Sequence, residues 1–473
     1  MTPRRIILLL VDALRADCLG CYGHEGKLTA NIDRLAARGV RFENAFSASN
    51  FTAPAVASLF TSLYPAAHGV YDFRIKKLPP TKIMEVAAKA GLFRKAIVDF
   101  GFFKSFLGRS FDDMESLTDL APNWSTEGPV VETRRAVEWI TAHKDEPFFL
   151  FLHISPTHAP YRFPRVWYER IMGDAALRPR IDALRNHPSL GGFLPVPEGD
   201  RIPDAEIARF SQSARYAEEG RIEDDLVGLI RDLYRLEVRV VDEAVGTLAG
   251  ALDRLGIFET TVFSVSADHG EELWDHGSFG HGDEAMYNEV IRTPWIVTCP
   301  GGIRPGTVVR ECVSQTSVVP TVLDLAGLDV GGVPSTGSMR ELVAGPSAGA
   351  VGTGDGRARA VFSDTARRIG VVDGRFKLIA PSRRSRFSSR TERAKHALHR
   401  AVLRGKGVEL YDLGRDPAER INLASREKGA VKALEQAADR YYRTVPPEWS
   451  AGADLTRAEE EQMRKELDGL GYL

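Results

Sequence analysis

The feature that most constrains the fold of this chain is a buried strand that ends in Asp-His-Gly. Residues 260–265 read Thr-Thr-Val-Phe-Ser-Val, a β-branched and apolar run typical of a strand covered on both faces. Asp268 and His269 follow it closely. In open α/β sheets, ligands and catalytic groups gather at the carboxyl ends of the strands, so this pair could offer an oxygen and a nitrogen to a metal ion. For the dipeptide alone, a helix N-cap Asp followed by an incidental His is the simpler interpretation.

The rest of the chain alternates between strand and helix patterns. Strand patterns cover residues 6–11, 40–45, 95–98, 147–153 and 294–298, and helix patterns cover 28–39, 52–63, 82–90, 132–143 and 229–255. Strands that alternate with helices of this length are typical of parallel sheets with helices on both faces. The sequence therefore predicts an α/β fold with a large, doubly wound, mostly parallel sheet flanked by helices.

A second, smaller unit is expected toward the C-terminus. At 473 residues, the chain exceeds the length at which a single core stops growing. After a Gly- and Ala-rich stretch at 343–357, short strand patterns follow at 360–363, 369–372 and 376–379, with a turn at Asp373-Gly374 and a charged helix near the end. We expect a catalytic domain at residues 1–345 and a C-terminal subdomain at 355–473, with a small antiparallel sheet and a terminal helix.

Two segments lack a clear secondary-structure pattern. Residues 161–227 are weakly periodic and contain several prolines, so we interpret them as a lid or insertion in the catalytic domain. Residues 382–404 are strongly basic and are interpreted as a solvated or mobile surface segment.

Charge and hydropathy exclude several classes of partner. The net charge of -2 gives no reason to expect binding to nucleic acid or to an anionic membrane. The first apolar run spans six residues and ends at Asp12 without a cleavage site, and no run reaches the roughly 18 residues of a membrane span. We therefore expect no membrane insertion and a cytoplasmic location. The oligomeric state stays open.

The four cysteines are too few for a disulfide framework. Cys18 and Cys21 have the spacing of a metal-binding pair, but the chain has no second pair of this kind, so we expect both to be buried thiols.

Oxygen-bearing side chains stand at the ends of other segments too. Asp12 closes the first strand, and Thr52 opens a helix pattern, where free N–H groups favour an anion. Together with Asp268 and His269, they would form an oxygen-rich site for one divalent cation. Mg²⁺, Ca²⁺ or Mn²⁺ is expected before Zn²⁺, because oxygen donors outnumber the single imidazole. Such a site beside a helix N-terminus suits a phosphate or sulfate ester.

Motifs in the right order over nearly the whole chain resemble those of the sulfatases of the alkaline-phosphatase superfamily. They lie at residues 7–12, 14–17, 19–23, 31–36, 39–42, 52–61, 64–65, 68–70, 158–161, 241–242, 266–271, 276–277, 280–282, 291–294, 409–413, 416–417, 422–423 and 470–473. The resemblance implies a metal-dependent hydrolase or transferase acting on a small-molecule or carbohydrate ester.

The resemblance also assigns roles to individual residues. It implies that Asp12, Asp268 and His269 hold the metal and that Thr52 is the nucleophile and a further ligand. His158 and His281 stand where the family contacts substrate oxygens or the leaving group, although a packing role stays open for both.

Other polar residues are given structural interpretations. His153 is interpreted as a core histidine, and His68 and His276 as structural residues in His-Gly turns. Asp242 is interpreted as an anchor of its own helix.

The chain departs from the family pattern at positions that affect the chemistry. The family motif is Cys or Ser, x, Pro, x, Arg, whose first residue becomes formylglycine, whereas Thr52, Pro54 and Val56 stand here. Ala13 replaces the second acid of an opening Asp pair, and Gly246 stands where two-metal relatives have a His. Related phosphotransferases use Thr nucleophiles. We therefore expect cleavage of phosphate or phosphonate esters, with sulfate esters as the rival substrates and a non-catalytic anion-binding protein as the alternative of another class.

Overall fold

The fold is described from a computed structural model of the chain. It describes residues 5–71, 78, 81–116, 128–159, 161–163, 173, 175, 178–186, 196–197, 224–282, 285–299, 301–331, 337–344, 360–382 and 407–443. The expected lid at 161–227 and the basic segment at 382–404 lie largely outside these residues. Their predicted roles stay predictions.

An eight-stranded sheet forms the centre of the molecule, in the order β12-β2-β11-β8-β1-β5-β3-β4. Its strands are β1 (Arg5–Val11), β2 (Val40–Phe46), β3 (Phe93–Val98), β4 (Asp113–Ser116), β5 (Phe148–Ile154), β8 (Thr261–Ala267), β11 (Arg292–Thr298) and β12 (Thr307–Ser314). Only β11 runs antiparallel to its neighbours β2 and β8, whereas the other pairings are parallel. The predicted mostly parallel α/β sheet is confirmed.

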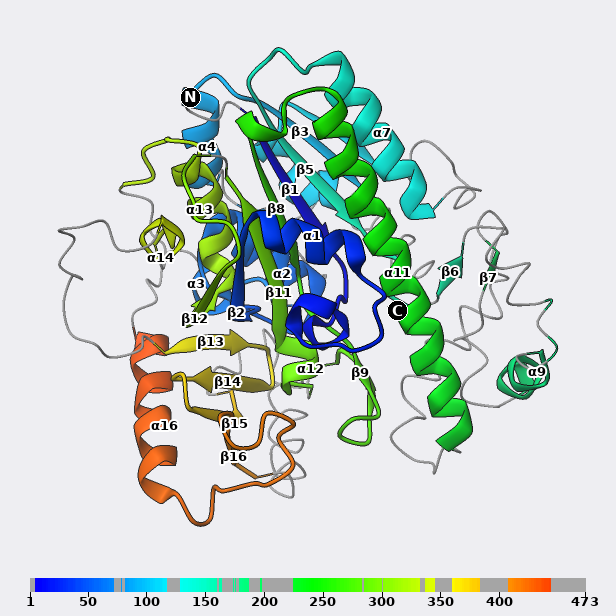
Figure 1. Cartoon of the computed structure of the whole chain (residues 1–473). Coiled ribbons are helices and arrows are strands. Elements are labelled where there is room, and N and C mark those ends of the chain that lie inside the picture. Colours follow the sequence, from blue (N-terminus) through cyan, green and yellow to red (C-terminus); the bar gives the residue numbers. More distant parts are fainter. Residues whose placement is uncertain are drawn as a thin grey trace.

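Helices cover both faces of this sheet (Figure 1). Alternate residues of β1 enter separate cores: Ile6, Leu8 and Leu10 on one face, and Ile7, Leu9 and Val11 on the other. The first core also contains residues of α2 (Thr52–Thr61), α4 (Lys82–Lys89) and α13 (Val318–Leu325). The second contains residues of α1 (Ala30–Arg38), α7 (Gly128–Ala142) and the long α11 (Asp224–Arg254). Burial on both faces explains why the strands read as continuous apolar runs.

A separate antiparallel sheet lies below the large sheet in Figure 1. It contains β13 (Val361–Asp364), β14 (Arg368–Val372), β15 (Phe376–Pro381) and β16 (Glu409–Asp412), in that order. One face packs on α16 (Lys428–Arg443), and the other packs on β2 and α12 (Asn288–Ile291). Gly374 has φ 97° in the predicted turn between β14 and β15. The expected small sheet is confirmed, and the exact domain boundary stays a prediction.

Shorter elements complete the described structure. The remaining α-helices are α3 (Pro65–His68), α5 (Phe102–Leu107), α9 (Arg178–Asn186) and α14 (Arg340–Ala344). The 3-10 turns are Ala16–Cys18, Gly20–Tyr22, Gly108–Ser110, Phe258–Thr260 and Gln315–Ser317. β9 (Glu272–Leu273) pairs with β10 (Phe279–Gly280), and β6 (Arg162–Phe163) pairs with β7 (Val196–Pro197).

The described elements that have no counterpart in the sequence prediction include β4, β12 and α13. The edge strand β12 carries Arg310 and Glu311 and has a register shift against β2, so it lacks a clean alternating pattern. Helix α13 begins Val-Val-Pro, a β-branched sequence that disfavours a helix on propensity alone.

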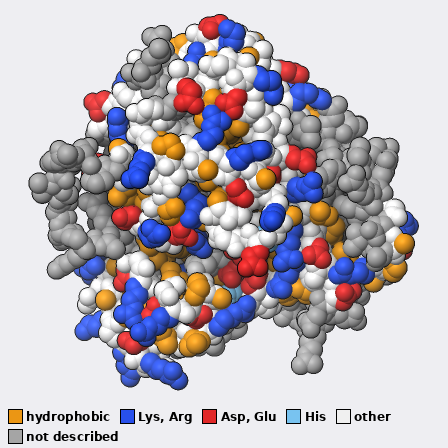
Figure 2. Space-filling model, viewed as in Figure 1, with side chains coloured by type: hydrophobic (Ala, Val, Ile, Leu, Met, Phe, Trp, Pro, Cys, Tyr) orange, Lys and Arg blue, Asp and Glu red, His pale blue; other side chains and the backbone are white. Residues whose placement is uncertain are grey.

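The described surface agrees with the near-neutral charge of the chain. On the face shown in Figure 2, Lys and Arg side chains are interspersed with Asp and Glu. Within the described ranges, no helix combines the length and apolar character that a membrane span needs. Cys18 is buried as expected, whereas Cys21 is only partly buried, and burial raises the pKa of both thiols to about 12.

Candidate active site

The candidate site lies at the carboxyl ends of two neighbouring strands. β1 and β8 pair in parallel, with Val11 opposite Ala267. The residues that follow, Asp12 and Asp268, therefore leave the sheet side by side. Both carboxylates are fully buried. The sheet register thus brings together two acids that are distant in the sequence.

His269 and Thr52 complete a compact group with these acids. His269 Nε2 lies 3.6 Å from Asp12 Oδ1 and 3.5 Å from Asp268 Oδ2. The hydroxyl of Thr52, the first residue of α2, lies 3.2 Å from the same nitrogen. The structure therefore brings together all four residues predicted to bind a metal.

The hydrogen bonds of His269 define its tautomer. Nδ1 lies 2.8 Å from the carbonyl oxygen of Gly270, which can only accept a hydrogen bond. Nδ1 therefore carries the proton, and the lone pair of Nε2 faces Thr52 and the two acids. This is the orientation of a metal-ligating histidine held by a backbone carbonyl.

Backbone geometry at Ala13 orients the Asp268 carboxylate. Ala13 is buried in the left-handed region at φ 58°, and its N–H donates to Asp268 Oδ1 at 3.1 Å. Its carbonyl accepts a hydrogen bond from Tyr234 at 2.7 Å, which holds the turn in place. Asp268 Oδ1 also accepts from the N–H of His269 at 2.8 Å. The other oxygen, Oδ2, is thereby directed toward the site.

The unsatisfied oxygens of this group fit a bound cation. Both carboxylate oxygens of Asp12 and Oδ2 of Asp268 are buried without a hydrogen-bond partner among the described residues. Burial, together with the charge of Asp268, raises the pKa of Asp12 well above its ordinary value. Burial lowers the pKa of His269 to about 3, so its ring is neutral and can act as a ligand.

The ligand atoms are also spaced as a metal site requires. Those of Asp12, Asp268 and His269 lie within 4.8 Å of one another. Ligands bound to one ion at about 2.0–2.6 Å lie roughly 3–4 Å apart, so these residues suit a divalent cation.

Two further histidines, which the sequence predicted as contacts to the substrate, adjoin the group. The ring of His281 lies 4.2 Å from that of His269 and 5.0 Å from that of His158, measured between centroids. His158 Nδ1 donates to the carbonyl of Ala159 at 2.6 Å, which leaves Nε2 as an acceptor. Burial lowers the pKa of His281 to about 3. Both rings can exchange protons or hydrogen bonds with a ligand bound beside His269.

Glu271 is a functional candidate that the sequence did not predict. Its Oε1 lies 2.9 Å from His281 Nδ1, and its side chain is almost fully buried. Burial raises its pKa well above the ordinary value, opposed by the nearby charge of Arg15. Glu271 fixes the plane of the His281 ring. Its position two residues after His269 was the available signal, but the sequence did not show its contact with His281.

Two amides also brace the site and were not predicted. Asn50 donates to the carbonyls of Gly282 and Ala285, joining the start of α2 to the loop that carries His281. Gln315 donates to the carbonyls of Ala267 at 2.9 Å and Asp268 at 3.2 Å. No sequence pattern distinguishes these residues from other buried amides.

Two histidines interpreted as structural, and Val56, have well-defined surroundings. His153 is fully buried beside Phe100 and Phe103, as expected for a core histidine. His68 Nε2 lies 2.8 Å from the hydroxyl of Ser58. Val56, at the family's arginine position, packs in the core between the sheet and α2.

Asp242 acts at longer range than predicted. It lies in α11 but accepts hydrogen bonds from the N–H groups of Asn31 and Ile32, both at 2.8 Å. It therefore caps the first turn of α1. The expectation that it anchors its own helix is wrong, because the free N–H groups it satisfies belong to a neighbouring helix.

Comparisons with known proteins agree on the family. A family model described as Sulfatase matches residues 4–328. Human arylsulfatase A is 26% identical over 471 residues, covering 92% of this chain and 86% of the relative. The arylsulfatase of Clostridium perfringens is 22% identical, covering 72% and 78%. The phosphonate monoester hydrolase of Agrobacterium radiobacter has a similar fold, with a TM-score of 0.65, 20% identity and coverage of 93% and 96%.

Proposed function

This chain belongs to the sulfatase family, whose members are metal-dependent hydrolases of ester bonds, and we propose that it cleaves phosphate or phosphonate esters. In this proposal, Thr52 is the nucleophile. Asp12, Asp268, His269 and the Thr52 oxygen hold one divalent cation. His158 and His281 contact the substrate oxygens or the leaving group.

The observation that carries this proposal is the position of the Thr52 hydroxyl. It stands at the first residue of α2, 3.2 Å from His269 Nε2 and beside two acids with unsatisfied oxygens. The free N–H groups of the first helical turn favour an anion at that point. A bound divalent ion would lower the pKa of a coordinated hydroxyl and draw negative charge off the ester.

The neighbouring residues support transfer of a phosphoryl group to Thr52. In this proposal, the Thr52 oxygen forms a bond to phosphorus while the bond from phosphorus to the leaving oxygen breaks, and the leaving oxygen takes up a proton. The rings of His158 and His281 lie beside His269, where a ring nitrogen would accept the proton that Thr52 loses and pass it to the leaving oxygen. Water or an acceptor alcohol then attacks phosphorus and releases Thr52.

The identity of residue 52 favours phosphorus over sulfur. A formylglycine hydrate has a second hydroxyl that can expel sulfate by cleavage of its carbon–oxygen bond. A threonine has only one hydroxyl, so a sulfo-threonine would require direct attack at sulfur. A phospho-threonine is easier to resolve, because a cation and a helix N-terminus stabilise in-line attack at phosphorus.

A sulfatase activity is the second candidate within this enzyme class. It is favoured by the 26% identity to human arylsulfatase A over 92% of this chain. A non-catalytic anion-binding protein is the candidate of another class.

Turnover of generic aryl esters tests all three candidates. Purified protein with Mg²⁺, Ca²⁺ or Mn²⁺ is given p-nitrophenyl phosphodiester, phosphonate and sulfate substrates. We expect multiple turnovers on a phosphorus ester, retention of part of this activity in Thr52→Ser, and its loss in Thr52→Ala. Sustained sulfate release by the unmodified protein would contradict the phosphorus preference. Metal binding without turnover of any ester would favour the non-catalytic candidate.

A further inference from the structure

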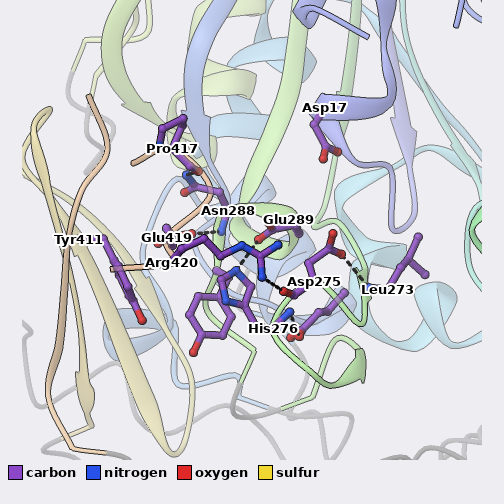
Figure 3. Close-up of polar contacts among 12 residues, drawn as sticks. Asp17, Leu273, Asp275, His276, Asn288, Glu289, Tyr411, Pro417, Glu419 and Arg420 are labelled. Carbon is purple, nitrogen blue, oxygen red and sulfur yellow. Dashed lines mark hydrogen bonds and ion pairs between the residues drawn. The ribbon is translucent and has the colours of Figure 1, made fainter. Parts of the chain in front are cut away.

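A second group of buried ligand atoms shares no residue with the candidate active site, and Figure 3 shows its members. His276 comes from the loop between β9 and β10, Glu289 from α12, and Glu419 from the loop between β16 and α16. One ligand atom from each lies within 4.8 Å of the others. The group therefore joins the large unit to the C-terminal segment.

Two atoms of this group are buried without hydrogen-bond partners. His276 Nε2 and Glu289 Oε2 lie 3.5 Å apart, and their side chains are only 8% and 10% exposed. Neither atom has a hydrogen-bond partner in the part of the chain that the structure describes. Leaving such a group buried and unsatisfied destabilises the fold. A ligand between the two atoms would remove this destabilisation.

The imidazole is held with Nε2 toward the acids. Its ring stacks on Tyr287, with centroids 3.6 Å apart and an interplanar angle of 9°. The Tyr287 hydroxyl donates to Glu409 at 2.8 Å, and the N–H of His276 donates to Glu272 at 3.0 Å. Ring and backbone are thus fixed by contacts that leave Nε2 unused.

The charges in this region favour a cation. The three acids Glu272, Glu289 and Glu419 lie here with one buried ammonium, that of Lys377, which is 2.8 Å from Glu419 Oε1. Arg420, which adjoins the group in Figure 3, donates to the backbone carbonyl of Asp275. With His276 neutral, these three acids, Lys377 and Arg420 together carry one net negative charge. A cation between His276 Nε2 and Glu289 Oε2 would offset this charge and would also provide a partner for both atoms.

We propose that His276 Nε2, Glu289 Oε2 and Glu419 Oε1 bind a second divalent cation, of the Zn²⁺ class, in a structural site. Two ligands at about 2.0–2.1 Å from a tetrahedral ion lie roughly 3.3–3.5 Å apart, close to the observed nitrogen–oxygen distance. Glu419 Oε1 has two lone pairs, so it can serve both Lys377 and the ion. The other oxygen of Glu419 accepts from the N–H of Asn288 at 2.6 Å, which orients the carboxylate. This proposal does not depend on the proposed function.

The site would fasten the C-terminal segment to the large unit. Glu419 is held in the left-handed region at φ 53°, and it contacts α12 through Asn288. A cation shared by Glu419, Glu289 and His276 would add bonds across this junction. Removal of the ion is expected to loosen the C-terminal sheet before the large sheet.

Crystals of the unmodified protein, soaked in or grown with ZnCl₂, test the site directly. We expect an anomalous difference peak at the zinc edge between His276 and Glu289, separate from any peak at Asp12 and Asp268. Absence of a peak there, with zinc present at the other site or at neither, would overturn the proposal.

Variants provide an independent measurement in solution. Asp268→Asn, which removes a ligand of the candidate active site, should still bind one zinc per chain by elemental analysis. Zinc should raise its melting temperature by about 2–4 °C. Adding Glu289→Gln to this variant should remove both the zinc and the shift. Equal zinc uptake by the single and double variants would contradict the proposal. If the double variant does not fold, the zinc content of Asp268→Asn and the anomalous map decide the question.

Discussion

His269 Nε2 lies 3.2 Å from the hydroxyl oxygen of Thr52, although 217 positions separate the two residues in the sequence. The contact exists because α2 begins beside the carboxyl end of β8. At this distance Nε2 can accept a hydrogen bond from the Thr52 hydroxyl, or both atoms can ligate one cation. The contact therefore defines the part of the molecule where we expect catalysis.

Loss of one Asp268 oxygen should abolish binding of the active-site cation. Asp268→Asn replaces one of the two carboxylate oxygens, Oδ1 or the buried Oδ2, by an NH₂ group and removes the negative charge. The amide is therefore a weaker ligand for a divalent cation. We expect Mg²⁺, Ca²⁺ or Mn²⁺ binding, measured by titration calorimetry, to weaken at least 100-fold, and turnover to be lost with it. Asp242→Asn, a matched change in a carboxylate that caps α1, should leave binding intact. Unchanged affinity in Asp268→Asn would contradict the assignment of this ligand.

Side-chain bulk at residue 13 should destabilise the strand-end turn. Ala13 is fully buried at φ 58°, a region that β-branched residues avoid. Ala13→Val should lower the free energy of unfolding by about 2 kcal/mol or more, whereas Ala13→Gly should change it by less than about 1 kcal/mol. Urea unfolding measures both. Equal effects of the two substitutions would show that the left-handed turn is not a constraint.

Removal of the long-range helix cap should weaken the fold without removing the metal. Asp242→Ala leaves the N–H groups of Asn31 and Ile32 without their present acceptor. We expect a loss of about 1–3 kcal/mol in the free energy of unfolding, and a smaller loss in Asp242→Asn. Loss of metal binding at full stability would instead assign Asp242 to the site.

The core histidine should make the protein sensitive to acid. Burial lowers the pKa of His153 to about 3, whereas an unfolded histidine titrates near 6.5. Between about pH 6.5 and pH 3, only the unfolded state binds this proton. The free energy of unfolding therefore decreases by up to about 1.4 kcal/mol for each unit by which the pH is lowered. His153→Leu should reduce the stability loss between pH 7 and pH 5 by about 2 kcal/mol. Urea unfolding at several pH values measures this difference. If the free energy of unfolding had the same pH dependence in the variant, His153 would titrate normally in the folded protein.

Much of the fold could be predicted because burial leaves a pattern in the sequence. Six of the eight strands of the large sheet and the three strands of the predicted C-terminal sheet were recognisable as short apolar runs. The reversed direction of β11 could not be predicted, because an apolar run reads the same for parallel and antiparallel pairing. The charged edge strand β12 was missed because one side of it lacks a neighbouring strand to bury it.

The sequence alone determined which side chains stand at the strand and helix ends. Asp12, Asp268 and His269 could be identified because each lies where a buried apolar run stops, and Thr52 because it opens a helix. Only the tertiary structure decided their distances and their supporting contacts. The pairing of β1 with β8, the contact of Glu271 with His281, and the meeting of Glu419 with α12 join segments from distant or separately folded parts of the chain. The physical reason is that a local pattern records whether a residue is buried, whereas the partner it meets depends on how separate elements pack.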